Sequence, residues 1–202
     1  MSLFDTFDPD SEAIISPSPA CLSPDGFPET VILTFQDETF QALERLCSTE
    51  VIANHRAGRD IPIYRLRWNG RSIGICQTLL GGAGTAGLLE ETLAMGAKKV
   101  LLYGSCGVLD SALTAGHFII PTAAYRDEGT SYHYMPVGDY VDIPTAEQLG
   151  EVFDELRLPY VKGRVWTTDA FYRETRNNME KRRADGCLAV DMECASAMAV
   201  GR

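Results

Sequence analysis

Hydrophobic and polar positions along the chain follow two periods, one typical of strands and one typical of helices. Short β-branched or continuous apolar runs predict strands at 29–35, 61–68, 71–80, 98–104, 116–121, 160–168 and 187–193. Spacing and end signals between these runs predict helices at 37–48, from the glycine cluster 81–87 to about residue 95, from residue 145, at 176–184 and after residue 193. This alternation predicts an α/β layered fold around a largely parallel or mixed sheet.

Local signals add detail to this pattern. Asn69-Gly70 between two strands predicts a tight β-hairpin. The continuous apolar run 98–104 is typical of a strand covered on both faces. Pro121 is expected to end the strand before it, and 124–144 to form a long functional or mobile loop. Thr145 is expected to cap the next helix with its side chain.

The two ends of the chain differ from its middle. Residues 1–28 are rich in Pro, Ser and Asp and predict an irregular N-terminal arm, followed by one domain over 29–202. The last helical stretch stops at Gly201-Arg202 after barely two turns. One interpretation is a missing C-terminal segment, and the other is a short helix that ends there.

Composition narrows the classes of function. A chain of 202 residues with 45% hydrophobic residues is an ordinary globular protein of one domain, or at most a small pair. Eighteen basic and 28 acidic residues give a net charge of −10, which disfavours nonspecific binding to nucleic acid or anionic membranes. The six cysteines form no CxxC pair, no run of 18 apolar residues occurs, and the acidic N-terminal residues predict no secretory signal. We therefore expect a cytoplasmic protein with reduced thiols and no metal site.

Two glycine motifs carry candidate chemistry. Residues 82–87 read G-x-G-x-x-G between a strand and a helix, which indicates either a dinucleotide site or a tight turn; the next strand lacks the acid that a dinucleotide site needs. Gly104 and Ser105 follow a buried strand, where backbone N–H groups and a hydroxyl can hold an anion. A simple turn is the alternative, and a Cys106 nucleophile paired with a histidine is a weaker one.

The remaining candidates follow the last two strands. Asp191 and Glu193 either accept hydrogen bonds from vicinal hydroxyls, as on a ribose, or cap a helix. Phe171 or the next tyrosine stacks on a planar base or belongs to the core. Arg56 and Arg59 are candidates for anion contact, with plain surface exposure as the alternative.

Taken in order, five stretches resemble the nucleoside phosphorylase family, of the uridine phosphorylase and hexameric purine nucleoside phosphorylase type. The stretches are CQTLLGGAGT (76–85), LLYGSCGVL (101–109), RDEGTSYHYMP (126–136), TTDAFYRET (167–175) and VDMECASA (190–197). The resemblance implies a three-layer α/β/α sandwich with a mixed, partly closed central sheet. It also implies a homodimer or homohexamer, and reversible cleavage of a nucleoside by phosphate to a free base and ribose 1-phosphate, without a cofactor.

The same resemblance assigns roles to residues of this chain. Glu193 is expected to bind the ribose hydroxyls and to be the catalytic residue, with Met192 against the sugar. Phosphate is expected at Gly104 and Ser105 and at Arg56, which the family takes from a neighbouring subunit. Phe171 is expected to stack on the base.

Departures from the family pattern leave alternatives open. Acidic residues stand at 37–38 where the family has a loop with an arginine, and Leu102 replaces a second phosphate arginine. Thr175 and Asn177 stand where uridine phosphorylases read uracil, so the base preference is not assigned. A hydrolytic nucleosidase, a noncatalytic nucleoside-binding protein and a dinucleotide-dependent oxidoreductase are the alternatives to a phosphorylase.

Overall fold

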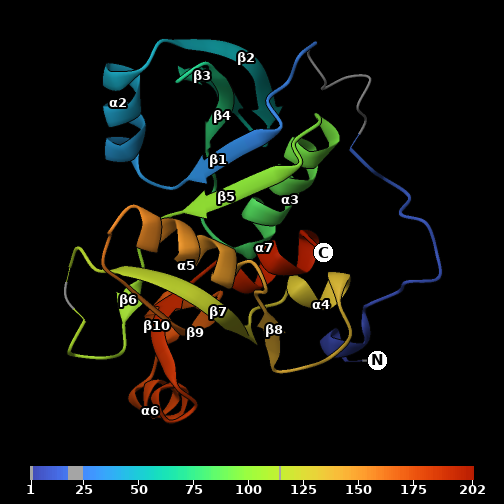
Figure 1. The fold of residues 1–202 in the computed structure, drawn as a ribbon. Coiled ribbons are helices and arrows are strands. Elements are labelled where there is room, and N and C mark those ends of the chain that lie inside the picture. The colour runs from blue at the N-terminus through green and yellow to red at the C-terminus, as the bar shows by residue number, and fades with distance from the viewer. Residues whose placement is uncertain (1, 18–24, 114) are drawn as a thin grey trace. The chain divides into compact units, whose positions relative to one another are not determined.

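A computed structural model of the chain describes residues 2–17, 25–113 and 115–202 (Figure 1). The chain divides into two compact units. Unit 1 consists of Met1–Pro9, Gly81–Ala83 and Cys106–Arg202, and unit 2 consists of Asp10–Leu80 and Gly84–Ser105. The part of the expected N-terminal arm at 18–24 lies outside the described residues, and the expected boundary after residue 28 stays a prediction.

Unit 2 is built on a five-stranded sheet in the order β2-β3-β4-β1-β5. Strands β4, β1 and β5 are parallel, whereas β2, β3 and β4 are antiparallel. The strands are β1 (Thr30–Thr34), β2 (Thr49–Arg56), β3 (Asp60–Trp68), β4 (Arg71–Gln77) and β5 (Lys99–Tyr103). Two helices complete the unit, α2 (Asp37–Leu46) and the residues of α3 (Gly82–Ala94) from Gly84 onward.

The hairpin expected at Asn69-Gly70 joins β3 to β4. Both residues have positive φ, 48° and 75°, as a type I′ turn requires, and Trp68 pairs with Arg71 across it. The expected bounds of β1, α2, β3 and α3 agree with the structure to within a few residues.

Alternate residues of the unit 2 strands face opposite sides of the sheet. Leu33, Ile63 and Cys76 lie in register and are fully buried on one side. On the other side the Tyr64 ring packs edge-on against Phe40 of α2, with ring centroids 4.7 Å apart. The expectation that β5 is covered on both faces was wrong, because alternate residues on one face of the strand are exposed, with Leu101 41% exposed.

Unit 1 is built on a second five-stranded sheet in the order β6-β10-β9-β7-β8. Strands β10, β9 and β7 are parallel, and β6 and β8 are antiparallel edges. The strands are β6 (Gly107–Val108), β7 (Phe118–Asp127), β8 (Tyr140–Asp142), β9 (Tyr160–Thr168) and β10 (Cys187–Asp191). The helices are η1 (Leu3–Asp5), α4 (Ser131–Tyr134), α5 (Ala146–Glu155), η2 (Phe171–Arg173), α6 (Arg176–Ala184) and α7 (Cys194–Val200).

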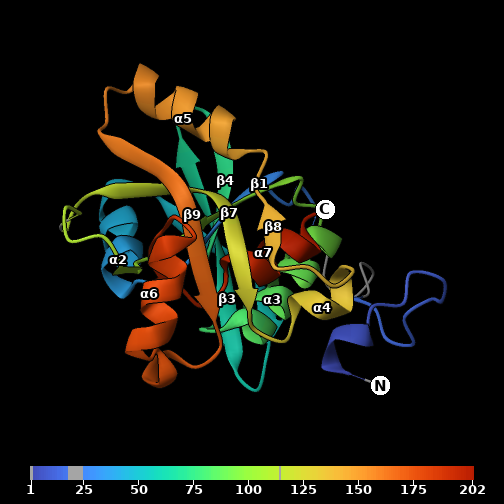
Figure 2. The same cartoon turned by 90° about the horizontal axis from the view of Figure 1, so that it is seen from below.

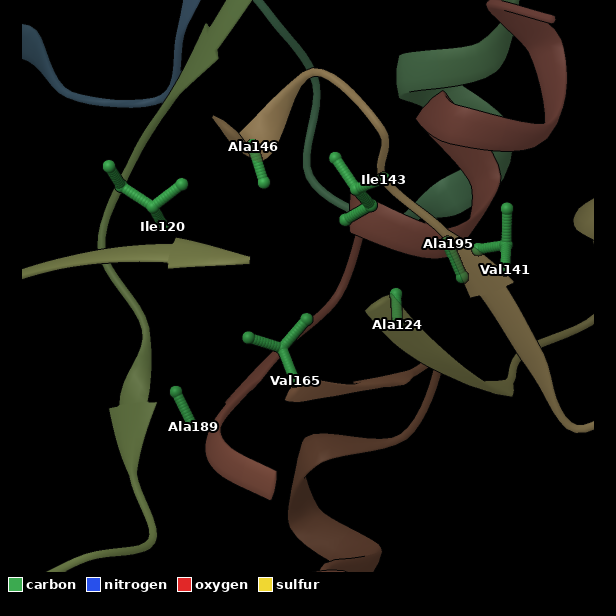
Figure 3. Close-up of a cluster of buried hydrophobic side chains, with 8 residues drawn as sticks. All are labelled: Ile120, Ala124, Val141, Ile143, Ala146, Val165, Ala189 and Ala195. Atoms are coloured by element: carbon green, nitrogen blue, oxygen red, sulfur yellow. The ribbon is translucent and has the colours of Figure 1, made fainter. Parts of the chain in front are cut away.

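Helices cover both faces of the unit 1 sheet, whose strands β7 and β9 run side by side in Figure 2. On one face, side chains from β7, β8, β9 and β10 pack with α5 and α7, as Figure 3 shows for Ile120, Ala124, Val141, Ile143, Ala146, Val165, Ala189 and Ala195. The opposite face holds Trp166 and Val190, with Met179 of α6 packed against them. The indole Nε1–H of Trp166 donates to Asp127 Oδ2 at 2.9 Å.

Three expectations for unit 1 were wrong in detail. Strand β7 continues through Pro121 to Asp127, because its register with β9 shifts beside the proline and the β8 pairing begins only at Ala123. The loop expected over 124–144 therefore holds the end of β7 together with α4 and β8. Thr145 precedes α5, but among the described residues its side chain receives no capping hydrogen bond, since Thr145 itself has helical φ and ψ.

Within residues 2–17, 25–113 and 115–202 no helix is both long enough and apolar enough to cross a membrane. The five cysteines they contain are free, and Cys21 lies outside them.

Candidate active site

Glu193 follows β10 and is the N-cap residue of α7. Its side chain is buried, with 7% of the residue exposed. Oε1 accepts a hydrogen bond from the Gly81 N–H at 2.7 Å, and Oε2 accepts one from the Met192 N–H at 3.3 Å. Burial raises the pKa of this carboxyl, and the two N–H groups oppose the rise. Backbone donors thus hold Glu193 in one orientation.

Asp191 has a different role from Glu193. Its Oδ1 accepts from the Glu193 and Cys194 N–H groups at 2.8 and 2.7 Å and from the Thr167 hydroxyl at 3.1 Å. These bonds satisfy free N–H groups at the start of α7, so the capping interpretation holds for Asp191. Oδ2 is buried and has no partner in the described part of the chain. Burial raises the pKa of this carboxyl to about 6.

Phe171 opens η2, just after β9. It is 49% exposed, and its ring lies 4.1 Å from that of Tyr172 at a tilt of 41°. The alternative of a core aromatic was therefore wrong. In the loop before Phe171, Asp169 Oδ2 accepts a hydrogen bond from the Gly129 N–H at 2.9 Å. This bond fixes the loop that carries the exposed Phe171 ring.

The sheet topology relates these residues. Strands β7, β9 and β10 are parallel neighbours, so their carboxyl ends lie at one edge of the sheet. Glu128, Phe171 and Glu193 each follow one of these ends. In α/β sheets this edge is the usual place for ligands.

Gly104, Ser105 and Arg56 belong to unit 2. Gly104 and Ser105 follow β5 and are exposed. A Cβ on Gly104 would lie 2.7 Å from the Phe35 ring, so this position requires glycine. Arg56 is the last residue of β2, opposite Asp60, and its side chain lies outside what the structure describes. The expected convergence of these residues with Glu193 and Phe171 stays a prediction.

The glycine cluster has a structural explanation. Gly81 has φ +88° and its N–H points at the Glu193 carboxylate. A Cβ on Gly82 would lie 2.2 Å from Ser196 Oγ, and one on Gly84 would lie 2.8 Å from Leu79 Cβ. Because the Gly81 N–H already donates to the Glu193 carboxylate, a pyrophosphate bound at this turn would be repelled by the negative charge of Glu193. The tight-turn interpretation is therefore favoured over a dinucleotide site.

The nucleophile interpretation of Cys106 is not supported. Burial and the nearby Asp191 raise the pKa of its thiol, which disfavours the reactive thiolate. His133, a histidine considered as the base for this cysteine, is exposed on α4. Arg59, a candidate for anion contact, is exposed between β2 and β3. No group of three or more His, Cys, Asp or Glu side chains among the described residues is placed to hold a metal ion.

Several buried polar residues were not singled out by the sequence analysis. Arg126 and Glu128 are 3% and 6% exposed, although they fall in the stretch expected to be a loop. His55 in β2 is fully buried, with Nδ1 2.6 Å from Glu91 Oε2 and Nε2 3.3 Å from the Thr92 hydroxyl. Burial lowers the pKa of His55, while Glu91 opposes this effect. The sequence signal for β2 is the apolar run Val51-Ile52-Ala53, which is too short to stand out.

Comparisons with known proteins show the family to which the chain belongs. Residues 29–202 match the family described as the phosphorylase superfamily. A guanosine phosphorylase of Halorubrum lacusprofundi is 28% identical over 165 residues, which cover 78% of this chain and 65% of that protein. A uridine phosphorylase of Thermococcus kodakarensis is 35% identical over 124 residues, which cover 60% of this chain and 43% of that one. The chain thus spans less than two thirds of the length of these relatives.

Solved structures give the same picture of the fold. Uridine phosphorylase from Vibrio fischeri superimposes with a TM-score of 0.79 at 22% identity, over 95% of this chain and 81% of that one. Purine nucleoside phosphorylase from Toxoplasma gondii, in complex with immucillin-H, superimposes with a TM-score of 0.77 at 22% identity, over 94% and 77%. The expected fold class, a nucleoside phosphorylase-like α/β fold, is confirmed. With a family match that covers all but the first 28 residues, the chain belongs to the phosphorylase superfamily.

Proposed function

We propose that this protein is a pentosyltransferase that cleaves the N-glycosidic bond of a nucleoside with phosphate. The C1′–N bond breaks as a phosphate oxygen bonds to C1′, and the base leaves with the electron pair of the broken bond and takes up a proton. The products are a free base and ribose 1-phosphate. Phosphate enters as a co-substrate, and the proposal includes no cofactor.

One observation carries this proposal, namely the buried Glu193 carboxylate held by two backbone N–H groups at the edge of three parallel strands. A carboxylate accepts hydrogen bonds from two vicinal hydroxyls, which suits the ribose. Its negative charge also stabilises the positive charge that develops on the sugar as the base leaves. Glu193 is therefore the proposed catalytic residue, with Met192 beside the sugar.

The other substrates are assigned by the same proposal. Phe171 stacks on the base through its exposed ring. Gly104 and Ser105 bind phosphate through N–H groups and a hydroxyl, and Arg56 of a neighbouring subunit adds a charge. This last contact requires a homo-oligomer, a dimer or a hexamer, which light scattering on the purified protein tests directly.

A hydrolytic nucleosidase is the second candidate, and a specific observation favours it. Two family arginines for phosphate are replaced, one by Leu102 and one by the acidic Asp37-Glu38. Asp37 is moreover engaged, since its Oδ1 accepts a hydrogen bond from Gln77 Nε2. The loss of each charge-assisted hydrogen bond weakens phosphate binding by roughly 1.5–3 kcal/mol. Attack by water on the sugar does not need these arginines.

A panel of purine and pyrimidine nucleosides, incubated with and without phosphate, decides between these functions. Base release that depends on phosphate, with ribose 1-phosphate as the second product, supports the phosphorylase. Release of free ribose that is independent of phosphate supports the nucleosidase. Nucleoside binding by calorimetry without turnover indicates a noncatalytic binding protein. Glu193→Gln should lower kcat by about 100-fold or more, because it removes the charge opposite the developing cation.

A further inference from the structure

A second buried carboxylate lies at the same sheet edge as Glu193. Glu128 directly follows β7 and is 6% exposed. Its Oε2 accepts from the Ser131 N–H at 3.0 Å and from the Ser196 hydroxyl at 2.5 Å. Arg126 supplies opposite charge nearby, and its Nε donates to Ser131 Oγ at 2.8 Å. Glu128 is therefore a fixed member of a polar network that joins β7, α4 and α7.

The Ser196 hydroxyl, fixed by Glu128, supports the backbone of the glycine turn. A Cβ on Gly82 would lie 2.2 Å from Ser196 Oγ and 3.3 Å from Glu128 Oε2. The turn therefore lies directly on this pair of side chains, at a distance that only glycine permits. A change in the position of the Ser196 hydroxyl or the Glu128 carboxylate would therefore remove the side-chain atoms against which Gly82 packs.

The same turn holds Glu193. The Gly81 N–H donates to Glu193 Oε1, and Gly81 adopts a positive φ that aims this N–H. Glu193 is the N-cap residue of α7 and Ser196 lies in the first turn of this helix, so the start of α7 contacts the glycine turn twice, once by a hydrogen bond and once by close packing. The position of the Gly81 N–H thus depends on Ser196, and the position of Ser196 Oγ depends on Glu128.

We propose that Glu128 and Ser196 are positioning residues that set the orientation of the Glu193 carboxylate through the Gly81-Gly82 turn. The inference rests on the proposed function for its catalytic consequence, namely recognition of the sugar hydroxyls. Its structural content, the dependence of the Gly81–Glu193 hydrogen bond on Ser196, does not rest on that function.

Ser196→Ala is the primary variant because it removes one oxygen and keeps the Cβ. Glu128→Gln keeps an oxygen that accepts from Ser196 and serves as the conservative variant. Glu147→Gln is the matched control, since Glu147 forms an ion pair with Lys162 at 2.6 Å on the surface of α5. Thermal unfolding of all three shows that each variant is folded.

The first measurement is kcat/KM for a ribonucleoside divided by kcat/KM for the same nucleoside without its 2′-hydroxyl. We expect this ratio to fall about 10- to 100-fold in Ser196→Ala, to fall less in Glu128→Gln and to stay unchanged in Glu147→Gln. A general loss of structure would lower both rates together and leave the ratio unchanged, and that result overturns the link to sugar recognition.

The second measurement is the hydrogen-exchange rate of the Gly81 amide by NMR, which needs no activity. We expect exchange at least 10-fold faster in Ser196→Ala than in the wild type or in Glu147→Gln. Unchanged Gly81 exchange in Ser196→Ala overturns the inference. If the wild type releases no base from any nucleoside, the proposed function fails, and the exchange rates still decide whether Ser196 positions the Gly81–Glu193 hydrogen bond.

Discussion

Replacement of Asp191 by asparagine tests the electrostatics of the α7 N-terminus. Burial raises the pKa of this carboxyl from an ordinary 3.8 to about 6, while its Oδ1 accepts three hydrogen bonds. Between these two pH values the folded state binds a proton that the unfolded state has released. Stability from this group is therefore lost as pH rises through the window from about 4 to about 6.

The magnitude follows from the two pKa values. At 1.36 kcal/mol per pKa unit, the difference corresponds to about 3 kcal/mol. This is an upper value, because the residue as a whole is only partly buried although its Oδ2 is buried. An asparagine side chain at this position would keep an oxygen for the capping N–H groups and carry no charge at any pH. Asp191→Asn should thus gain up to about 3 kcal/mol relative to the wild type between pH 4 and pH 7.5.

Urea unfolding of wild type and Asp191→Asn at half-unit steps from pH 4 to pH 8 measures this difference. The asparagine amide also introduces a buried donor, which lowers stability by the same amount at every pH. The test is therefore how the difference in unfolding free energy between the two proteins changes with pH. Glu151→Gln, which removes the charge of an exposed carboxylate on α5, is the control variant. A difference between wild type and Asp191→Asn that is constant across the range would refute the reasoning.

Three further predictions concern other parts of the chain. Gly82→Ala should cost about 1–3 kcal/mol in urea unfolding, because its methyl group meets Ser196 Oγ, and added Ser196→Ala should recover part of this loss. Burial lowers the pKa of His55, so below pH 6.5 the unfolded state binds more protons than the folded state and the wild type loses stability. His55→Gln should abolish this loss in urea unfolding at stepped pH. The same dependence of stability on pH in variant and wild type would contradict this expectation. Phe171→Ala should raise the nucleoside KM about 3- to 10-fold in steady-state assays, with thermal stability unchanged, since its ring is half exposed; an unaltered KM argues against stacking.

Elements with strong local signals were predictable from the sequence. Strand β9 and helix α6 have the bounds that periodicity predicts, and the Asn69-Gly70 hairpin forms because both residues tolerate positive φ. Strand β7 was cut short in the prediction at Pro121. A proline is tolerated there because the pairing shifts beside it, and that property belongs to the neighbouring strands rather than to the local sequence.

The candidate site was predictable only in part. The resemblance identified Glu193 and Phe171, and the structure places them after adjacent parallel strands. The contacts that hold Glu193 come from Gly81, 112 positions away in sequence, and Glu128 lies 68 positions from Ser196. No local pattern contains such pairs, because they depend on how the strands are ordered in the sheet.

The two tryptophans of the chain lie one in each unit, so intrinsic fluorescence can report on the units separately. Trp166 in unit 1 is 1% exposed and hydrogen-bonded to Asp127, whereas Trp68 in unit 2 is 52% exposed beside the hairpin. A Trp68→Phe variant retains a single buried indole, whose emission shifts to the red only when unit 1 opens to solvent. Titration of this variant with a nucleoside and then with denaturant would show how much a ligand held by Glu193 stabilises unit 1 by itself.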